Sequence, residues 1–235
     1  MNKKKITIIL ISCVSLILVI LAIFITINKV NEYKDRKEKE QLVLEYRDNK
    51  KKIYIEENEK YDDYEVDVAF LGDSLTDGCD INKYYPSYLA VNRGIGGDRT
   101  YDVLKRIDYS VYDLKPKVIV LLIGGNNLDT MFDDYIDILR GIKENLPLTK
   151  CILVSLTAMG GKYKDKNKIV IENNKKIEAL AENYKFEYVE VFSLLYNDKL
   201  GEINPNYTTD GAHLTHEGYL ILTGAVNERL KSLLK

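Results

Sequence analysis

The amino-acid sequence predicts an α/β fold, a three-layer α/β/α sandwich with a central parallel sheet. From Val66 onward, short apolar runs alternate with segments of helical periodicity, and such alternation is typical of parallel sheets covered by helices. The run Val118–Ile123 is apolar at every position, as in a central strand that is buried on both faces. Glycine-rich polar stretches follow several of the runs, and they indicate the ligand-binding edge of an open sheet.

The first element in the chain is an apolar run, Ile6–Ile27, which contains no charged residue and follows the lysine-rich segment Met1–Lys5. About 20 apolar residues suffice to span a bilayer as a helix. A signal peptide has a shorter apolar centre and a small-residue cleavage site, which Ala22–Phe24 does not offer. Leu10–Cys13 resembles a lipoprotein cleavage box, but cleavage there would leave most of the run in place. We therefore predict a single-pass membrane anchor over residues 1–30.

The orientation of this anchor follows less directly from charge. Lys and Arg are more numerous between residues 29 and 39 than in Met1–Lys5, and that count alone would keep the large domain inside. The positive-inside rule is weak for long translocated segments, and acidic residues interleave with the basic ones. We expect the N-terminus inside and the domain outside the cytoplasm.

Residues 31–62 are rich in charge and contain neither Gly nor Pro. Their sparse apolar residues do not sustain a heptad, so the segment predicts a single helical stalk and not a coiled coil. A break near Asp48–Asn49 is left open, and a solvated tether is the alternative. Residues 63–235 then form the folded domain.

Composition restricts the function classes. A net charge of −2 offers no basic footprint for nucleic acid. The three cysteines include no Cys-x-x-Cys pair and there are only two histidines, so no zinc-binding spacing occurs. We expect no metal, no cofactor and no nucleic-acid partner, and the sequence does not determine the oligomeric state.

The expected elements of the domain follow from the alternating pattern. The strands are Val66–Leu71, Leu89–Asn92, Val118–Ile123, Cys151–Leu156 and Phe186–Val191. The helices are Tyr101–Tyr109, Met131–Asn145, Lys168–Tyr184 and His216–Leu234.

Four polar stretches accompany these elements. Gly72-Asp73-Ser74 ends the first strand and makes Ser74 a candidate nucleophile, although Asp73 or Ser74 could merely cap the next helix. Asn92–Thr100 is not a dinucleotide loop, because Arg99 stands where the last glycine is required. Gly124–Asn127 follows the third strand. Asp210–His213 precedes the last helix, where Asp210 could orient an imidazole toward Ser74, or act as a simple cap beside a surface histidine.

Taken together and in order, these stretches resemble the SGNH, or GDSL-type, hydrolase family from Phe70 to the last helix. The resemblance implies a flavodoxin-like sandwich and a catalytic triad of Ser74, His213 and Asp210. It also implies an oxyanion hole made by the backbone N–H groups of Ser74 and Gly97 and by the side chain of Asn126. One departure is Asn127, where the family usually has Asp; it removes no reacting group.

The implied function is that of a serine esterase in which His213 activates Ser74 and no cofactor takes part. No long apolar tract suggests an acyl-chain tunnel, and family analogy favours short acyl esters, with O-acetyl groups on cell-surface carbohydrate as the substrate. Three alternatives remain open: a lysophospholipase or lipase-like acyl hydrolase, an acyltransferase with the same triad, and a catalytically silent carbohydrate-binding module. The basic loop Met159–Lys168 is expected at the site, as a substrate flap or a solvated loop.

Overall fold

The structure is a computed structural model that describes the backbone of residues 3–234 and the side chains of residues 23–234. It divides into two compact units, Met1–Asn49 and Lys50–Lys235. Each unit is described by itself.

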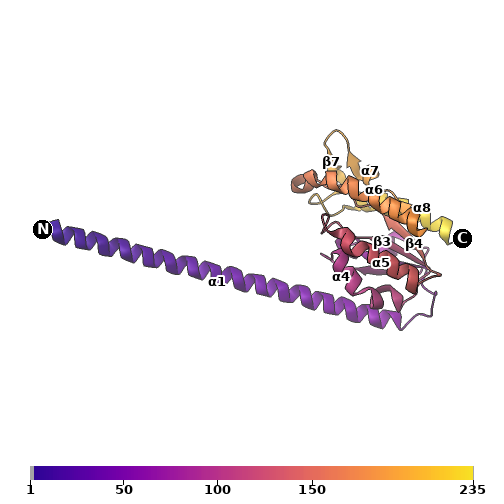
Figure 1. The fold of residues 1–235 in the computed structure, drawn as a ribbon, viewed down its shortest axis with the longest axis horizontal. Coiled ribbons are helices and arrows are strands. Elements are labelled where there is room, and N and C mark those ends of the chain that lie inside the picture. The colour runs from indigo at the N-terminus through magenta and orange to yellow at the C-terminus, as the bar shows by residue number, and fades with distance from the viewer. Residues whose placement is uncertain (1–2, 235) are drawn as a thin grey trace. The chain divides into compact units, whose positions relative to one another are not determined.

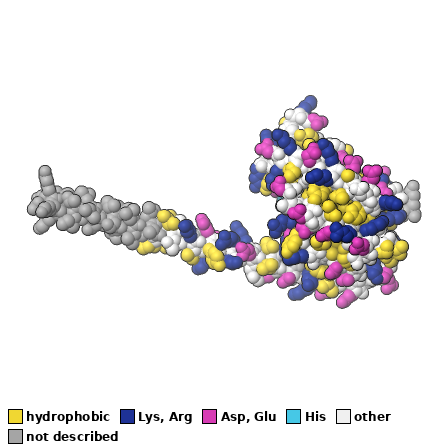
Figure 2. All heavy atoms as spheres, in the orientation of Figure 1, with side chains coloured by type: hydrophobic (Ala, Val, Ile, Leu, Met, Phe, Trp, Pro, Cys, Tyr) yellow, Lys and Arg dark blue, Asp and Glu magenta, His cyan; other side chains and the backbone are white. Residues whose placement is uncertain are grey.

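Helix α1 runs as one helix from Lys3 to Asn58. The first unit contains its residues up to Asn49, and its last nine residues belong to the second unit. The helix has no break at Asp48–Asn49. Its described part carries pairs one turn apart, such as Lys37 with Glu40 at 2.8 Å, and such pairs support an exposed helix modestly. Lys and Arg side chains are interspersed with Asp and Glu on the face drawn in Figure 2.

The predicted membrane-spanning run, Ile6–Ile27, lies mostly outside the residues whose side chains are described. Within the described part of the chain, no helix combines the length and the apolar character needed to cross a bilayer.

The second unit begins at Lys50, before the boundary at residue 63 that composition suggests. The last turns of α1 belong to this unit because Tyr54 is 2 % exposed and its hydroxyl donates a hydrogen bond to the carbonyl of Gly94. The residues that flank Tyr54 in the sequence are charged, so the sequence does not predict that its side chain is buried.

The second unit is built around a parallel sheet with the strand order β2-β1-β3-β4-β5, in line with the predicted α/β class (Figure 1). The same order defines flavodoxin-like sheets. The strands are β1 (Val68–Gly72), β2 (Ala90–Gly94), β3 (Val118–Leu122), β4 (Lys150–Val154) and β5 (Glu187–Val189). All five fall on the predicted runs, with ends shifted by a few residues.

The helices that follow α1 are α2 (Ser74–Asp77), α3 (Ile81–Tyr84), α4 (Thr100–Lys105), α5 (Met131–Asn145), α6 (Asn167–Tyr184), α7 (Phe192–Leu195) and α8 (His216–Leu233). Three of the four predicted helices, α5, α6 and α8, begin and end within one residue of the predicted positions. The helix predicted over Tyr101–Tyr109 is wrong in extent. It ends at Lys105, and a π-helical turn, Asp108–Tyr112, follows, in which the Asp113 N–H bonds the Asp108 carbonyl five residues back. A short hairpin of β6 (Tyr196–Asn197) and β7 (Glu202–Ile203) was not expected.

The topology brings the site together. Every residue of β1 and β3 is buried, which accounts for their continuous apolar character. The chain crosses from β1 to β2 on one side and then returns past β1 to β3 on the other. The carboxyl ends of β1 and β3 are therefore neighbours at the switch point of the sheet, where ligands bind in open α/β folds.

Candidate active site

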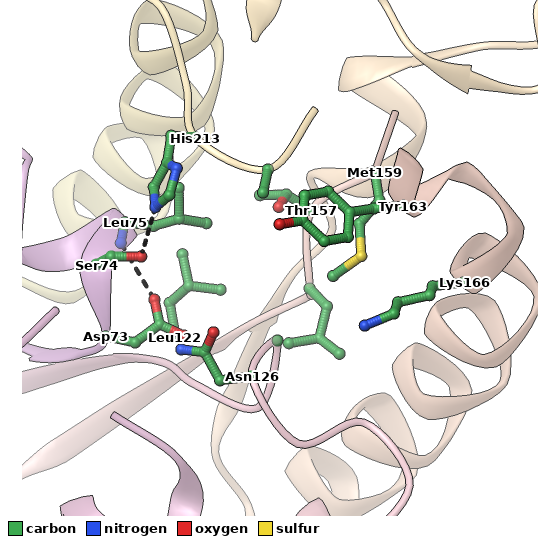
Figure 3. A pocket seen from close by; sticks show the side chains of 13 residues that line it. Asp73, Ser74, Leu75, Leu122, Asn126, Thr157, Met159, Tyr163, Lys166 and His213 are labelled. Carbon is green, nitrogen blue, oxygen red and sulfur yellow. Dashed lines mark hydrogen bonds between the residues drawn. The ribbon is translucent and has the colours of Figure 1, made fainter. Parts of the chain in front are cut away.

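Ser74 is the first residue of α2 and is separated from the end of β1 by Asp73 alone. The turn is tight: a Cβ atom at Gly72 would lie 2.3 Å from the carbonyl oxygen of Leu122, so only glycine fits. The Asp73 carboxylate caps α2 by accepting a hydrogen bond from the Leu75 N–H at 3.1 Å. The helix-capping role suggested for this stretch therefore falls to Asp73, and the hydroxyl of Ser74 faces His213 (Figure 3).

The imidazole of His213 joins Ser74 to Asp210. Nε2 lies 3.1 Å from the hydroxyl oxygen of Ser74, and Nδ1 lies 2.8 Å from Oδ2 of Asp210. The sequence separates Ser74 from the other two residues by most of the domain, and the fold brings them into one hydrogen-bonded row. This geometry suits a base that takes a proton from a hydroxyl group while a carboxylate orients its ring.

Asp210 is held as a carboxylate by its own turn. Its Oδ1 accepts hydrogen bonds from the backbone N–H groups of His213 at 2.8 Å and Ala212 at 2.9 Å. These bonds, together with the one to the imidazole, hold the pKa of Asp210 well below its usual value. Gly211 enables the turn: its φ is +91°, and a Cβ atom there would lie 2.2 Å from the carbonyl oxygen of Gly160.

A pocket of about 190 Å³ opens beside Ser74 (Figure 3). Leu122, Leu156 and Met159 line it with apolar surface, and Tyr163 and Lys166 reach it from the 3-10 turn Gly161–Lys166. The expectation that the loop Met159–Lys168 lies at the site is confirmed. The remaining lining residues are Asp73, Ser74, Leu75, Gly125, Asn126, Thr157, Ala212 and His213.

Asn126 lies at the end of β3 and lines the pocket. Its Nδ2 donates a hydrogen bond to the backbone carbonyl of Asp98 at 2.9 Å. A side-chain amide carries two N–H donors, so this bond orients the amide and uses one of them. Asn126 is thus held in position as a polar donor beside Ser74.

Gly97 is not one of the residues that line the pocket. Its φ of +80° is a conformation that glycine adopts readily. Within the described residues its N–H makes no hydrogen bond, whereas the preceding N–H, of Gly96, donates to Oδ2 of Asp77 at 2.9 Å. The structure therefore brings Ser74, His213 and Asn126 into one pocket, with Asp210 bonded to the far side of the imidazole, and it leaves Gly97 outside the pocket lining.

Asn127 takes a supporting position where the family usually has Asp. Its Oδ1 accepts a hydrogen bond from the N–H of Thr100 at 3.3 Å, and its Nδ2 donates to the hydroxyl of Thr100 at 2.9 Å. The amide thereby joins the loop after β3 to the first residue of α4. A carboxylate could accept from both groups of Thr100 but donate to neither.

Asp98 and Arg106 form a buried ion pair that the sequence does not reveal. Arg106 Nε lies 2.7 Å from Oδ2 of Asp98, and the two side chains are 5 % and 0 % exposed. Arg106 also donates to the carbonyl of Gly72 at 3.0 Å and to Ser110 Oγ at 2.9 Å. The pair therefore connects the turn before Ser74 with the loop that orients Asn126. No local signal predicts it, because an aspartate and an arginine eight positions apart are usual on a solvated surface.

The Asp73 carboxyl is buried beside these groups. Burial raises the pKa of Asp73 to about 7, and the nearby Asp98 carboxylate adds to the rise. The sequence suggested only a helix cap here. Asp73 is therefore a group in the pocket wall whose charge changes near neutral pH.

The second histidine lies outside the row. His216 is exposed, and its Nδ1 lies 2.7 Å from the hydroxyl of Tyr84. In the part of the chain with described side chains, no group of three His, Cys, Asp or Glu residues could hold a metal ion.

Comparisons with known proteins identify the family to which the chain belongs. Residues 70–221 match the GDSL-like Lipase/Acylhydrolase family. Platelet-activating factor acetylhydrolase IB subunit alpha1 of Bos taurus is 28% identical over 185 residues, covering 73% of this chain and 78% of that protein. Subunit alpha2 of Rattus norvegicus is 28% identical over 188 residues, covering 74% and 80%.

Solved structures show the same architecture. A GDSL-like lipase from Bacteroides thetaiotaomicron superposes with a TM-score of 0.69 at 26% identity, covering 77% of this chain and 97% of that one. An acetylxylan esterase from Geobacillus stearothermophilus has a TM-score of 0.58 at 20% identity, covering 72% and 95%, and is alike in fold. Because the family match covers more than half of the chain, the protein belongs to the GDSL-like lipase/acylhydrolase family and is a hydrolase of ester bonds.

Proposed function

We propose that the protein is a serine esterase that removes short acyl groups through an acyl-enzyme, with O-acetyl groups on cell-surface carbohydrate as its substrate. The observation that carries the proposal is the hydrogen-bonded row of Ser74, His213 and Asp210 at the mouth of a pocket of about 190 Å³. A hydroxyl group is a weak nucleophile until an adjacent base takes its proton. The row supplies that base and orients it.

In the first half of the reaction, the hydroxyl of Ser74 attacks the ester carbonyl while Nε2 of His213 takes its proton. The carbonyl oxygen becomes an oxyanion, which accepts hydrogen bonds from the N–H groups of Ser74 and Gly97 and from the amide of Asn126. His213 then gives its proton to the leaving alcohol oxygen, and the acyl group stays on Ser74. Asp210 remains a carboxylate and stabilises the imidazolium.

In the second half, water enters and His213 takes one of its protons. The resulting hydroxide attacks the acyl carbon, and the same donors stabilise the second oxyanion. Collapse of this intermediate breaks the bond to Ser74, whose oxygen regains the proton from His213. Losing one oxyanion donor typically costs about a hundred- to a thousandfold in rate.

The size of the pocket supports a short acyl group. A pocket of about 190 Å³ lies below the range of roughly 300–1,000 Å³ that is typical of sites for larger ligands. The names of the platelet-activating factor acetylhydrolase subunits refer to acetyl removal, as does that of the acetylxylan esterase, which is alike in fold. Carbohydrate is proposed for the alcohol side because the pocket rim carries Tyr163 and Lys166, groups that suit a polar sugar.

We also propose that residues 1–30 anchor the protein in a membrane as a single span, with the catalytic domain outside the cytoplasm. The apolar run Ile6–Ile27 has sufficient length. Large apolar side chains at its described end, such as Ile23 and Phe24, are more than half exposed, which favours a non-aqueous environment around them.

The proposal is tested with p-nitrophenyl esters of increasing acyl length and with O-acetylated polysaccharides, followed by release of acetate. Acetyl and propionyl esters should be hydrolysed best. Ser74→Ala and His213→Ala should each abolish nearly all activity, and the double variant should be scarcely worse than either, since members of a triad act non-additively. Multiplicative losses would show that the two residues do not work together.

The same assay separates the alternatives. A preference for long acyl chains or lysophospholipids would identify a lipase-like enzyme. Acyl transfer to an added alcohol in preference to water would identify an acyltransferase. Binding of acetylated glycan without turnover would identify a silent carbohydrate-binding module.

A further inference from the structure

The last turns of α1 dock onto the carboxyl end of β2 and the end of α2. Lys50, Tyr54, Glu57 and Asn58 are spaced by four, three and one residues, so they share one face of the helix. Each of them makes a polar contact with a later part of the second unit. Tyr54 bonds Gly94, Glu57 and Asn58 bond Arg93, and Lys50 bonds Asp77. The helix end therefore contacts both the end of β2 and the short helix that Ser74 begins.

Arg93 anchors this contact inside the protein. Its side chain is 0 % exposed and pairs with the carboxylate of Glu57. Its guanidinium also donates to Asn58 Oδ1 at 2.8 Å and lies 4.7 Å from the centre of the Tyr54 ring. A buried charge is retained only where such partners satisfy it, so this end of α1 is part of the folded domain.

Lys50 makes the contact nearest to the nucleophile. Its Nζ lies 2.6 Å from Oδ1 of Asp77, and the two side chains are only 22 % and 16 % exposed. Oδ2 of the same carboxylate accepts the N–H of Gly96 at 2.9 Å. Because both carboxylate oxygens are engaged, Lys50 restrains the rotation that would release the Gly96 N–H.

Asp77 connects two parts of the proposed oxyanion hole. It ends the short helix α2 that Ser74 begins. Its carboxylate holds Gly96, the residue before Gly97, and a Cβ atom at Gly96 would lie 4.0 Å from the Cβ of Ser74. The end of β2 and the end of α2 pack closely, since a Cβ atom at Gly94 would lie 2.2 Å from the backbone nitrogen of Asp77.

We propose that Lys50 is a positioning residue for the oxyanion hole: it acts through Asp77 to hold the Gly96–Gly97 backbone against the nucleophile turn. The final turns of the stalk helix are thus a working part of the enzyme in addition to a tether. The inference rests on the proposed function, because it needs Gly97 to donate to the oxyanion. Displacing a catalytic donor by about 1 Å can reduce the rate on the order of a hundredfold.

The test compares Lys50→Met with Lys52→Met in the full-length chain. Lys52 is an exposed residue on the same helix and serves as the matched control. Lys50→Met should lower kcat about tenfold and leave KM within about twofold, since the oxyanion forms only after binding. Lys50→Arg should recover most of the loss, and Lys52→Met should match wild type.

Two further measurements separate positioning from folding. Hydrogen exchange at the Gly96 amide should accelerate in Lys50→Met while the thermal midpoint shifts by only a few degrees. Asp77→Asn, which keeps an acceptor for Gly96 but loses the charge, should lower kcat similarly, and adding Lys50→Met to it should cost little more.

The proposed esterase function and the role of Lys50 are contradicted by different results. Wild-type protein without esterase activity would overturn the proposed function. An active wild type with an equally active Lys50→Met, or with an unchanged Gly96 exchange rate, would overturn the role of Lys50 alone. If Lys50→Met does not fold, Asp77→Asn with wild-type kcat gives the same negative answer.

Discussion

At the scale of single residues, the Asp73 carboxyl caps helix α2 and is also buried. Its folded pKa is about 7 against an ordinary 3.8 because burial disfavours the charge. The folded state therefore binds more protons than the unfolded state between these pH values. The stability that Asp73 contributes is fully present below about pH 4 and is lost as the pH rises toward 7, by on the order of a few kcal/mol.

Asp73→Asn should remove this dependence. An amide oxygen can still accept the Leu75 N–H, and no charge has to be buried at high pH. Relative to wild type, the variant should gain free energy of unfolding as the pH rises from about 4 to about 7, as measured by denaturant titration. Asp80→Asn, the same change at the exposed cap of α3, is the control. An equal pH response of wild type and Asp73→Asn would contradict the burial of a titrating carboxyl.

Asn126 allows the oxyanion hole to be tested at one side chain. The residue is exposed and its described polar contact is with the Asp98 carbonyl, so the fold depends little on it. Asn126→Ala should lower kcat by about a hundred- to a thousandfold and leave KM and the thermal midpoint nearly unchanged. Asn183→Ala, at an exposed position of α6, provides the comparison in steady-state kinetics. Full activity of Asn126→Ala would reduce Asn126 to a turn residue.

At the scale of elements, the Asp98–Arg106 pair connects α4, the end of β1 and the loop after β2. Arg106→Met would leave the Asp98 carboxylate buried without its cation. Breaking a buried pair in this way typically costs about 3–5 kcal/mol. Denaturant unfolding should show a loss of that size.

Arg140→Met is the matched control, because Arg140 pairs with Asp137 at 3.0 Å on an exposed helix face. Exposed pairs contribute about 1 kcal/mol or less. Similar losses in the two variants would mean that the Asp98–Arg106 pair is no more important to stability than a surface pair.

At the scale of the whole molecule, the proposed anchor and the catalytic unit should be separable. The full chain should fractionate intact with membranes, and a protein starting at Asn31 should be soluble and active because it retains Lys50–Asn58. Protease added to intact cells should remove the domain from its anchor, as followed by immunoblotting. Complete protection in intact cells, with cleavage after lysis, would reverse the proposed orientation.

The α/β class and the positions of the strands follow from local patterns in the sequence. Buried parallel strands must be apolar on both faces, so the sequence alone predicts that Val118–Ile123 forms a central strand. Polar glycine-rich residues at strand ends converge on one edge by topology. The resemblance of their motifs to the SGNH family then allowed Ser74, Asn126 and His213 to be named together although they lie far apart in the chain.

Other features depend on contacts that no local pattern records. Arg93 and Arg106 read as surface residues in the sequence, yet partners distant in the chain make their burial favourable. The start of the domain also depends on such contacts, because residues 50–58 have the same charged composition as the stalk and only their packing assigns them to the domain. The sequence by itself determined the α/β class, the order of the site motifs and the apolar N-terminal run, because each depends only on residues that are close together in the chain. Only the tertiary structure decided which charges are buried and where the catalytic unit begins, because a charged side chain enters a protein interior only when long-range packing supplies its partner.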